Sequence, residues 1–210
     1  MALIGKRALL HHLTIGPIAA LLVYLFWLSR PSLDSDVRLW KALGNSAFVF
    51  LSATLIIGPL AKLWNKTARL ISWRRETGIW YAFLAISHFL SVRGYALSEP
   101  GIKLPVLAGL TALFFTIALL ITSSDAALKF LGASSWKWIH YAAYIIFYLS
   151  AGHALYFLFL RYDERNWFRY PFLILALLVI TLQFAAFFKT VARQRKYQKL
   201  DDTQNNDSDN

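Results

Sequence analysis

Six apolar segments separated by short polar stretches form the hydropathy pattern of this chain. Each is close to the roughly twenty residues that an α-helix needs to cross the hydrocarbon core of a bilayer. The pattern therefore predicts an all-α, polytopic membrane protein built as a six-helix transmembrane bundle. We place the six helices at about residues 9–28, 44–60, 78–97, 104–121, 138–160 and 170–188.

The composition supports this prediction. Hydrophobic residues make up 58% of the chain and charged residues 16%, whereas a soluble domain carries about 25% charged residues. The loops are too short for a second folded domain, so residues 1–198 are expected to form one membrane domain. The polar, acidic segment 199–210 is expected to be disordered. No nucleotide or flavin fingerprint is present in the sequence.

The distribution of basic residues predicts the orientation of the chain. Fourteen of the 22 Lys and Arg residues lie on the flanks that would share one side of the membrane with the two termini. The positive-inside rule therefore predicts that both termini are cytoplasmic. The net charge of +11 is carried at the ends of apolar segments, which indicates contact with anionic lipid and not with nucleic acid.

Three histidines, His88, His140 and His153, lie within apolar segments of a chain that has no cysteine. An ionisable side chain inside a membrane helix costs on the order of 2–3 kcal/mol, which makes it a candidate functional residue. Imidazoles at membrane depth without thiolates suggest the axial ligands of a haem iron. At a rise of about 1.5 Å per residue, His88 lies closer in depth to His153 than to His140. We therefore expect His88 and His153 to form the first ligand pair.

His140 does not fit the same pair. It precedes His153 by thirteen residues, which separates the two by about 140° on an ideal helix. A bend, a π-bulge or a second haem would remove the conflict, and His11 or His12 is the candidate partner of His140. Arg74 and Arg75, at the start of the third helix, either pair with haem propionates or anchor the helix as positive-inside residues.

Three stretches carry a resemblance to a known family: SATLIIGPLAKLW, RRETGIWYAFLAISHFLSVRGYAL and WKWIHYAAYIIFYLSAGHALYF. They resemble the second, third and fifth helices of the MsrQ (YedZ) family, in the ferric reductase-like transmembrane superfamily. The resemblance covers roughly residues 40–190. Larger ferric reductases and NADPH oxidases carry two histidines on the third helix, and this chain has only His88 there.

The resemblance implies a function. It implies one or two b-type haems bound through His88, His140 and His153, in the inner (plasma) membrane of a bacterium. It further implies that electrons pass from a cytoplasmic flavin reductase or the quinone pool to a periplasmic molybdopterin-containing methionine sulfoxide reductase. FMN has also been associated with the family. The chain would then be an electron-transfer subunit of an oxidoreductase system, with no catalytic residue of its own singled out.

Two alternatives remain at this stage. The chain could reduce extracellular ferric or cupric ions directly, with the same haem. It could instead be a proton channel or transporter that uses its histidines as a relay without haem. Against a transporter, the apolar segments contain almost no Asp or Glu and show no inverted repeat.

Overall fold

The computed structural model describes residues 6–98, 103–161 and 166–208, and all of its regular elements are helices. In chain order they are α1 (Lys6–Leu28), α2 (Ser35–Leu63), the 3-10 segment η1 (Asn65–Trp73), α3 (Arg74–Ser98), α4 (Leu104–Ile121), α5 (Asp125–His140), α6 (Ala142–Leu155), the π-helical turn η2 (Tyr156–Leu160) and α7 (Arg169–Ser208). The described part of the chain contains no β-strand. The predicted all-α class is confirmed.

Five helical segments are long and apolar enough to cross a membrane: Ala8–Leu28, Ser35–Leu63, Leu104–Ile121, Asp125–Leu160 and Arg169–Gln198. Many of their exposed side chains are large and hydrophobic, among them Leu104 and Ile121, which are 79% and 71% exposed. Such a surface suits lipid. The chain is therefore a polytopic membrane protein.

Helix α3 is not among these five segments. It has 25 residues, enough to span a bilayer, but four charged residues lower its hydropathy: Arg74, Arg75, Glu76 and Arg93. Six spans and cytoplasmic termini thus stay predictions, because the five-segment count rests on length and apolarity alone.

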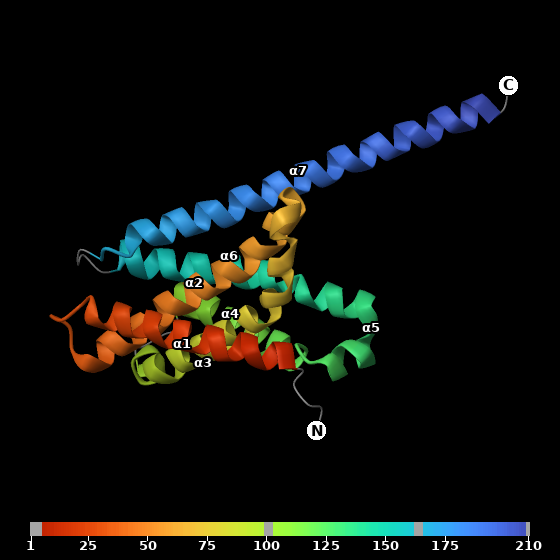
Figure 1. Cartoon of the computed structure of the whole chain (residues 1–210). Helices are drawn as coiled ribbons and strands as arrows, with labels where there is room; N and C mark the ends of the chain where they lie inside the picture. Colours follow the sequence, from red (N-terminus) through yellow and green to blue (C-terminus); the bar gives the residue numbers. More distant parts are fainter. Residues whose placement is uncertain (1–5, 99–102, 162–165, 209–210) are drawn as a thin grey trace.

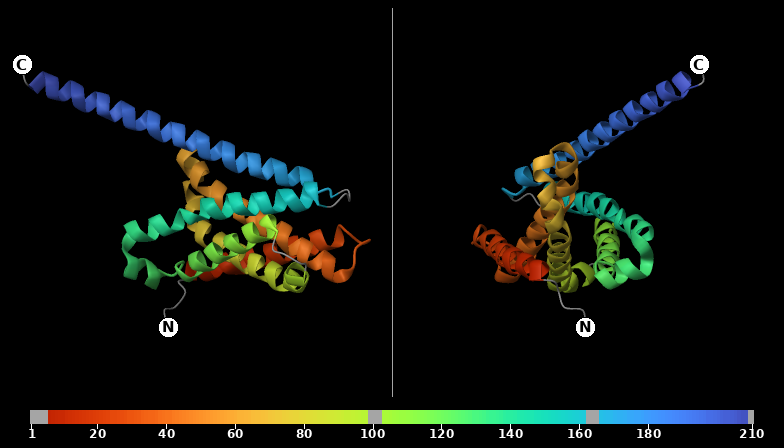
Figure 2. Two further views of the ribbon diagram at one scale, coloured as in Figure 1. Left: turned by 180° about the vertical axis from the view of Figure 1, so that it is seen from behind. Right: turned by 45° about the vertical axis from the view of Figure 1, so that its right-hand side comes forward.

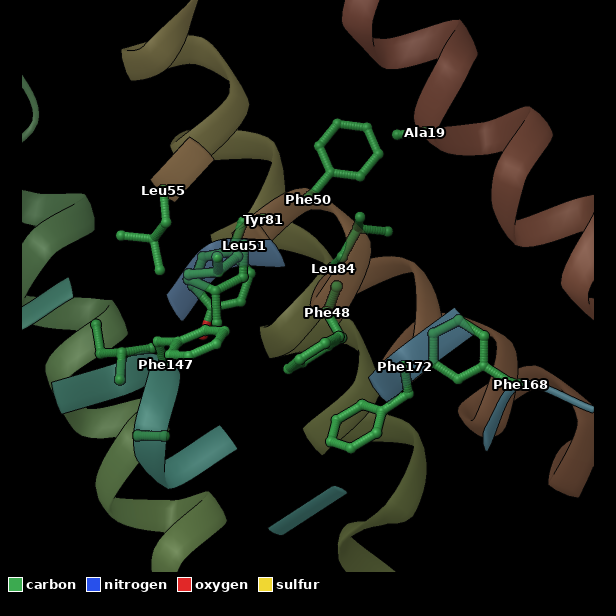
Figure 3. Packing of buried hydrophobic residues seen from close by; sticks show 14 of the residues in the cluster. Ala19, Phe48, Phe50, Leu51, Leu55, Tyr81, Leu84, Phe147, Phe168 and Phe172 are labelled. Carbon is green, nitrogen blue, oxygen red and sulfur yellow. The ribbon is translucent and has the colours of Figure 1, made fainter. Parts of the chain in front are cut away.

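Helix α2 occupies the centre of the bundle and packs against α1, α3, α6 and α7. Its buried side chains meet those of α6 and α7, where Phe48 and Phe172 lie with ring centroids 4.7 Å apart. Phe147 of α6 is 1% exposed and packs into the same core. Figure 3 shows this packing close up, with Leu51, Tyr81 and Phe147 among the labelled members of the buried cluster. The packed core closes the middle of the bundle.

The apolar segment at residues 138–160 differs from its prediction as a single helix. It is divided between the end of α5, the helix α6 and the π-helical turn η2, with a break at Tyr141. Helix α5 itself reverses at Gly132, which has φ 75° and ψ 155°, a conformation that costs glycine little because it has no Cβ. The two limbs of α5 protrude from one end of the bundle (Figure 1).

Helix α7 is longer than the predicted membrane segment 170–188. It continues through Ser208, and the disorder of segment 199–210 stays a prediction. The chain has no glycine or proline after Pro171, so no helix-breaking residue ends the helix earlier. Figures 1 and 2 show the C-terminal part of α7 projecting beyond the other helices.

Candidate functional site

A cavity of about 220 Å³ lies between helices α2, α3, α4 and α6, and His88 and His153 both line it. Most of its other lining residues are apolar, such as Phe89, Leu113 and Ala154. The sequence predicted that His88 and His153 lie at similar depth, and the structure brings the two side chains together. Their ring centroids are 6.4 Å apart.

His88 lies in α3 and is held by the neighbouring helix α2. Its Nδ1 is 2.8 Å from the carbonyl oxygen of Trp40. Since a carbonyl oxygen only accepts hydrogen bonds, Nδ1 must carry the proton and donate it. In the neutral imidazole, this hydrogen bond leaves the lone pair on Nε2.

His153 repeats this arrangement on the other side of the cavity. Its Nδ1 donates to the carbonyl oxygen of Pro105, at the start of α4, also over 2.8 Å. In both pairs the carbonyl precedes the histidine by 48 residues. In the part of the chain that is described, neither Nε2 atom has a hydrogen-bond partner. Both lone pairs are thus available to a metal.

Glycines let the two imidazoles reach these carbonyls. Gly44 lies four residues after Trp40, and a Cβ added to it would lie 3.1 Å from Nδ1 of His88. Gly109 lies four residues after Pro105, and a Cβ there would lie 2.7 Å from Nδ1 of His153. The second contact is shorter than real Cβ atoms allow. Each ring therefore occupies the space that a side chain would take on any other residue.

His140 lies outside this cavity. It ends α5, its ring stacks on Trp136 at a centroid distance of 3.9 Å, and its Nε2 is 3.4 Å from Oγ1 of Thr122. The break at Tyr141 lies between His140 and α6, so the two predicted ligands of this segment belong to different helices. His140 and His153 thus lie in different parts of the bundle.

The two predicted arginines also lie away from the cavity. Arg74 is an electrostatic neighbour of His140, and its guanidinium lies over Gly58 of α2, 3.7 Å from where a Cβ would stand. Arg75 forms a 2.5 Å ion pair with Asp125 at the start of α5. Arg74 and His140 form a second group of candidate residues, at the end of the bundle where α3 begins.

His11, a candidate partner of His140, has other neighbours. It stacks on Trp73 with centroids 4.0 Å apart, and its Nδ1 is 3.6 Å from Oε2 of Glu76. The structure does not bring His11 to His140.

The sequence reasoning missed the residues that support the two imidazoles: Trp40, Gly44, Pro105 and Gly109. Two of them act through backbone carbonyls, which leave no trace in side-chain chemistry. The available signal was a glycine four residues inside each of two apolar helices, since glycine destabilises a helix interior unless close packing requires it.

Similar proteins are found in the curated collection, although no family model matches the chain. A "Protein-methionine-sulfoxide reductase heme-binding subunit MsrQ" of Herminiimonas arsenicoxydans is 32% identical over 120 residues, which cover 52% of this chain and 54% of the relative. Proteins of the same name are 33% identical over 149 residues in Salmonella arizonae and 32% identical in Salmonella paratyphi B. These two alignments each cover 64% of this chain and 72% of the relative.

Proposed function

We propose that this chain, which belongs to the MsrQ family of protein-methionine-sulfoxide reductase heme-binding subunits, binds haem b between His88 and His153. The observation that carries the proposal is the pair of neighbouring imidazoles in one cavity, each donating through Nδ1 so that Nε2 of the neutral ring can ligate a metal. Hydrogen bonds from the other ring nitrogen to backbone carbonyls are a common support for metal-bound histidines.

The donor set favours haem over a bare metal ion. The described residues contain no group of three or more His, Cys, Asp or Glu side chains that could hold an ion, whereas a structural zinc site needs four ligands. Haem brings four nitrogen ligands of its own and needs only axial ones. Two imidazoles are then sufficient.

The spacing of the two rings also fits an ion between them. Bonds between a metal and an imidazole nitrogen are about 2 Å long, so two rings on opposite sides of one ion have centroids roughly 6 Å apart. The observed 6.4 Å agrees with this value. The apolar cavity wall around the pair suits the faces of a macrocycle.

Bound haem would supply one-electron chemistry inside the bilayer. The hydrocarbon core is about 30 Å thick, and amino-acid side chains offer no adequate carrier for an electron across it. We propose that electrons enter from the cytoplasmic side, from a flavin reductase or the quinone pool. The electrons then pass to a periplasmic, molybdopterin-containing methionine sulfoxide reductase. The relatives are heme-binding subunits of a protein-methionine-sulfoxide reductase, which supports this acceptor. The Lys and Arg count supports cytoplasmic termini.

We further propose that His140 and Arg74 belong to a second cofactor site at the other end of the bundle, for a second haem or FMN. Arg74 is close enough to His140 to act on it electrostatically, and a cation near a haem ligand would suit an anionic cofactor. Two sites along the bundle would shorten each electron step.

A histidine relay without haem is less well supported. A relay needs protons to enter and leave both ring nitrogens, and here both Nδ1 atoms are committed to helix carbonyls. A direct ferric or cupric reductase would use the same haem. Stable co-purification with a periplasmic reductase would favour the proposed relay over direct reduction of an ion.

Reduced-minus-oxidised absorbance spectra test the haem proposal. The wild type, purified in detergent after haem-replete expression, should show b-type bands, and His88→Ala and His153→Ala should each lose the haem of this cavity. His11→Ala is the matched control, because His11 stacks on Trp73 and does not line the cavity. A colourless wild type, or His88→Ala protein with unchanged haem content, would overturn the proposal.

A further inference from the structure

We propose that a buried hydrogen bond between Tyr81 and Thr116 sets the angle between the two imidazole ligands of the haem. Tyr81 is thus a positioning residue of this site, and the inference rests on the proposed haem function. The rings of His88 and His153 have an interplanar angle of 81°, so they stand almost perpendicular to each other.

The two histidines belong to separate helix pairs. Helix α3, which carries His88, packs chiefly against α2, and helix α6, which carries His153, packs chiefly against α4. Each ring is fixed within its own pair by its hydrogen bond to the carbonyl of Trp40 in α2 or of Pro105 in α4. The angle between the rings therefore depends on how the pair α2–α3 is held relative to the pair α4–α6.

The hydrogen bond between Tyr81 of α3 and Thr116 of α4 joins one pair to the other. The two hydroxyl oxygens are 3.0 Å apart. Tyr81 is 8% exposed and Thr116 is 1% exposed, and Figure 3 labels Tyr81 within the buried cluster. A hydrogen bond in such a low-dielectric interior is stronger than one in water.

Apolar packing also joins the two pairs, since the rings of Phe48 in α2 and Phe147 in α6 have centroids 6.1 Å apart. The hydrophobic effect that drives such packing is non-directional. A hydrogen bond, in contrast, is restricted in both distance and angle. The bond from Tyr81 to Thr116 is therefore the contact suited to fixing one relative orientation.

The direction of this bond follows from the protons available. The Thr116 hydroxyl donates its one proton to the carbonyl oxygen of Ala112, one turn earlier in α4, over 2.8 Å. Tyr81 must therefore donate and Thr116 accept. Ser150 of α6 is a further polar neighbour of the Tyr81 hydroxyl. Side chains of α3, α4 and α6 thus meet at one phenol group.

The register places the bond on the helix faces that hold the imidazoles. Tyr81 precedes His88 by seven residues, and Thr116 follows Gly109, against which the His153 ring lies, by seven. Seven residues are two helical turns and about 10 Å along the axis. Tyr81 also lines the same cavity as the two histidines. A shift of α4 against α3 at this bond would therefore move one imidazole relative to the other.

Electron paramagnetic resonance of the ferric haem measures the angle, because the axial ligands tune the electronic structure of the iron. Each imidazole donates π-electron density to the iron d orbital that lies perpendicular to the ring plane. Two perpendicular rings leave the two d orbitals concerned nearly equal in energy, which gives a strongly anisotropic low-spin signal. Two parallel rings split these orbitals and give a rhombic spectrum. The wild type should show the strongly anisotropic signal.

Tyr81→Phe removes the hydroxyl and keeps the ring, and Thr116 retains its own bond to Ala112, so this variant should fold. Its signal should shift towards the rhombic spectrum or split into several components. Thr116→Val should give the same change, and Thr116→Ser, which keeps the hydroxyl, should retain the wild-type signal. Because the two side chains form one bond, the double variant should shift the signal no further than either single variant. All spectra are recorded with His140→Ala present, so that only the haem of this cavity contributes.

Two matched controls remove a hydroxyl elsewhere in the same helices. Tyr148→Phe changes a tyrosine of α6 that is 55% exposed. Thr111→Val removes a hydroxyl of α4 that donates to the Leu107 carbonyl within the helix. Neither residue lines the cavity, and both variants should keep the wild-type signal. Thermal unfolding of every variant separates a change in ligand geometry from a loss of stability.

The outcomes separate this inference from the haem proposal. A rhombic wild type, or Tyr81→Phe and Thr116→Val proteins with the wild-type signal, would overturn the positioning role and leave haem binding intact. Variants that fail to fold, or lose stability without any change in the signal, make the bond a part of the core alone and also overturn it. A folded variant that no longer binds haem supports the inference, because both ligands must be directed at one iron. A wild type without haem overturns the proposed function itself.

Discussion

His88 and His153 line one cavity with their ring centroids 6.4 Å apart, and each donates its Nδ1 proton to a helix carbonyl 48 residues earlier in the chain. The two carbonyls are those of Trp40 and Pro105. The backbone of α2 and α4 thus fixes the tautomer and direction of both rings before any ligand binds. This preorganisation is the main structural support for a redox site in the bundle.

Substitution of Gly109 by alanine should weaken haem binding by about 10–100-fold, the usual cost of losing the partner of a metal-bound histidine. The added Cβ would lie 2.7 Å from Nδ1 of His153 and would push the ring off the Pro105 carbonyl. Gly44→Ala should have a smaller effect, because its Cβ would lie 3.1 Å from His88. Haem titration of the purified variants measures both.

Gly152→Ala is the control for these two variants. Gly152 precedes His153 in α6, and an added Cβ there would meet nothing within 4 Å. Haem affinity should remain at the wild-type value. Equal affinities for Gly109→Ala and Gly152→Ala would contradict the role given to the close approach at Gly109.

The sequence predicted the all-α membrane class and the approximate position of most helices. Apolar runs of about twenty residues are typical of membrane-spanning helices and rare elsewhere. It also predicted that His88 and His153 lie at similar depth, from the helix rise alone. It did not predict the reversal at Gly132 or the π-helical turn at Tyr156–Leu160. Both are local departures from helix geometry inside helical sequences, where tertiary packing outweighs propensity.

The supporting residues of the site were harder to predict for a different reason. A carbonyl group belongs to every residue, so the roles of Trp40 and Pro105 depend on helix contacts that only the fold defines. Likewise, Lys41 and Arg161 resemble ordinary flanking cations in the sequence. Their place on the cavity wall follows from how α2, α3 and α6 converge.

His140→Ala should lower the haem content without changing the His88–His153 site. His140 lies outside the cavity, so if it ligates a second haem, the content should fall from two haems to one per chain. Arg74→Gln should weaken that second haem alone. Pyridine haemochrome assays with quantified protein give the stoichiometry. A His140→Ala variant with wild-type stoichiometry would remove His140 from the ligand set.

Phe147→Ala should destabilise the protein by about 3–5 kcal/mol, the usual cost of truncating a buried aromatic side chain. Phe147 is 1% exposed and packs in the centre of the bundle. Phe130→Ala is the matched control, since Phe130 is 89% exposed and faces lipid or the interface. Thermal unfolding in detergent compares the two. A similar loss in both variants would show that Phe147 has no special part in the core.

Asp125→Asn should change the stability by less than about 1 kcal/mol, because exposed ion pairs contribute little. The Arg75–Asp125 pair joins the start of α3 to the start of α5, and the Asp125 side chain is 73% exposed. The same unfolding assay measures the change, and the haem spectrum of the variant should match the wild type. A large loss of haem would instead assign Arg75 and Asp125 to a cofactor site.

In both halves of the site, the carbonyl that accepts the hydrogen bond lies 48 residues before the histidine that donates it. Helices α2 and α3 form one antiparallel hairpin-like unit, and α4 and α6 form another. In each, a carbonyl and a glycine of the inbound helix support a histidine of the returning one. The same local arrangement of carbonyl, glycine and histidine therefore occurs twice in the site. Each histidine is oriented by its own pair of helices. A substitution in one pair should therefore leave the orientation of the other imidazole unchanged.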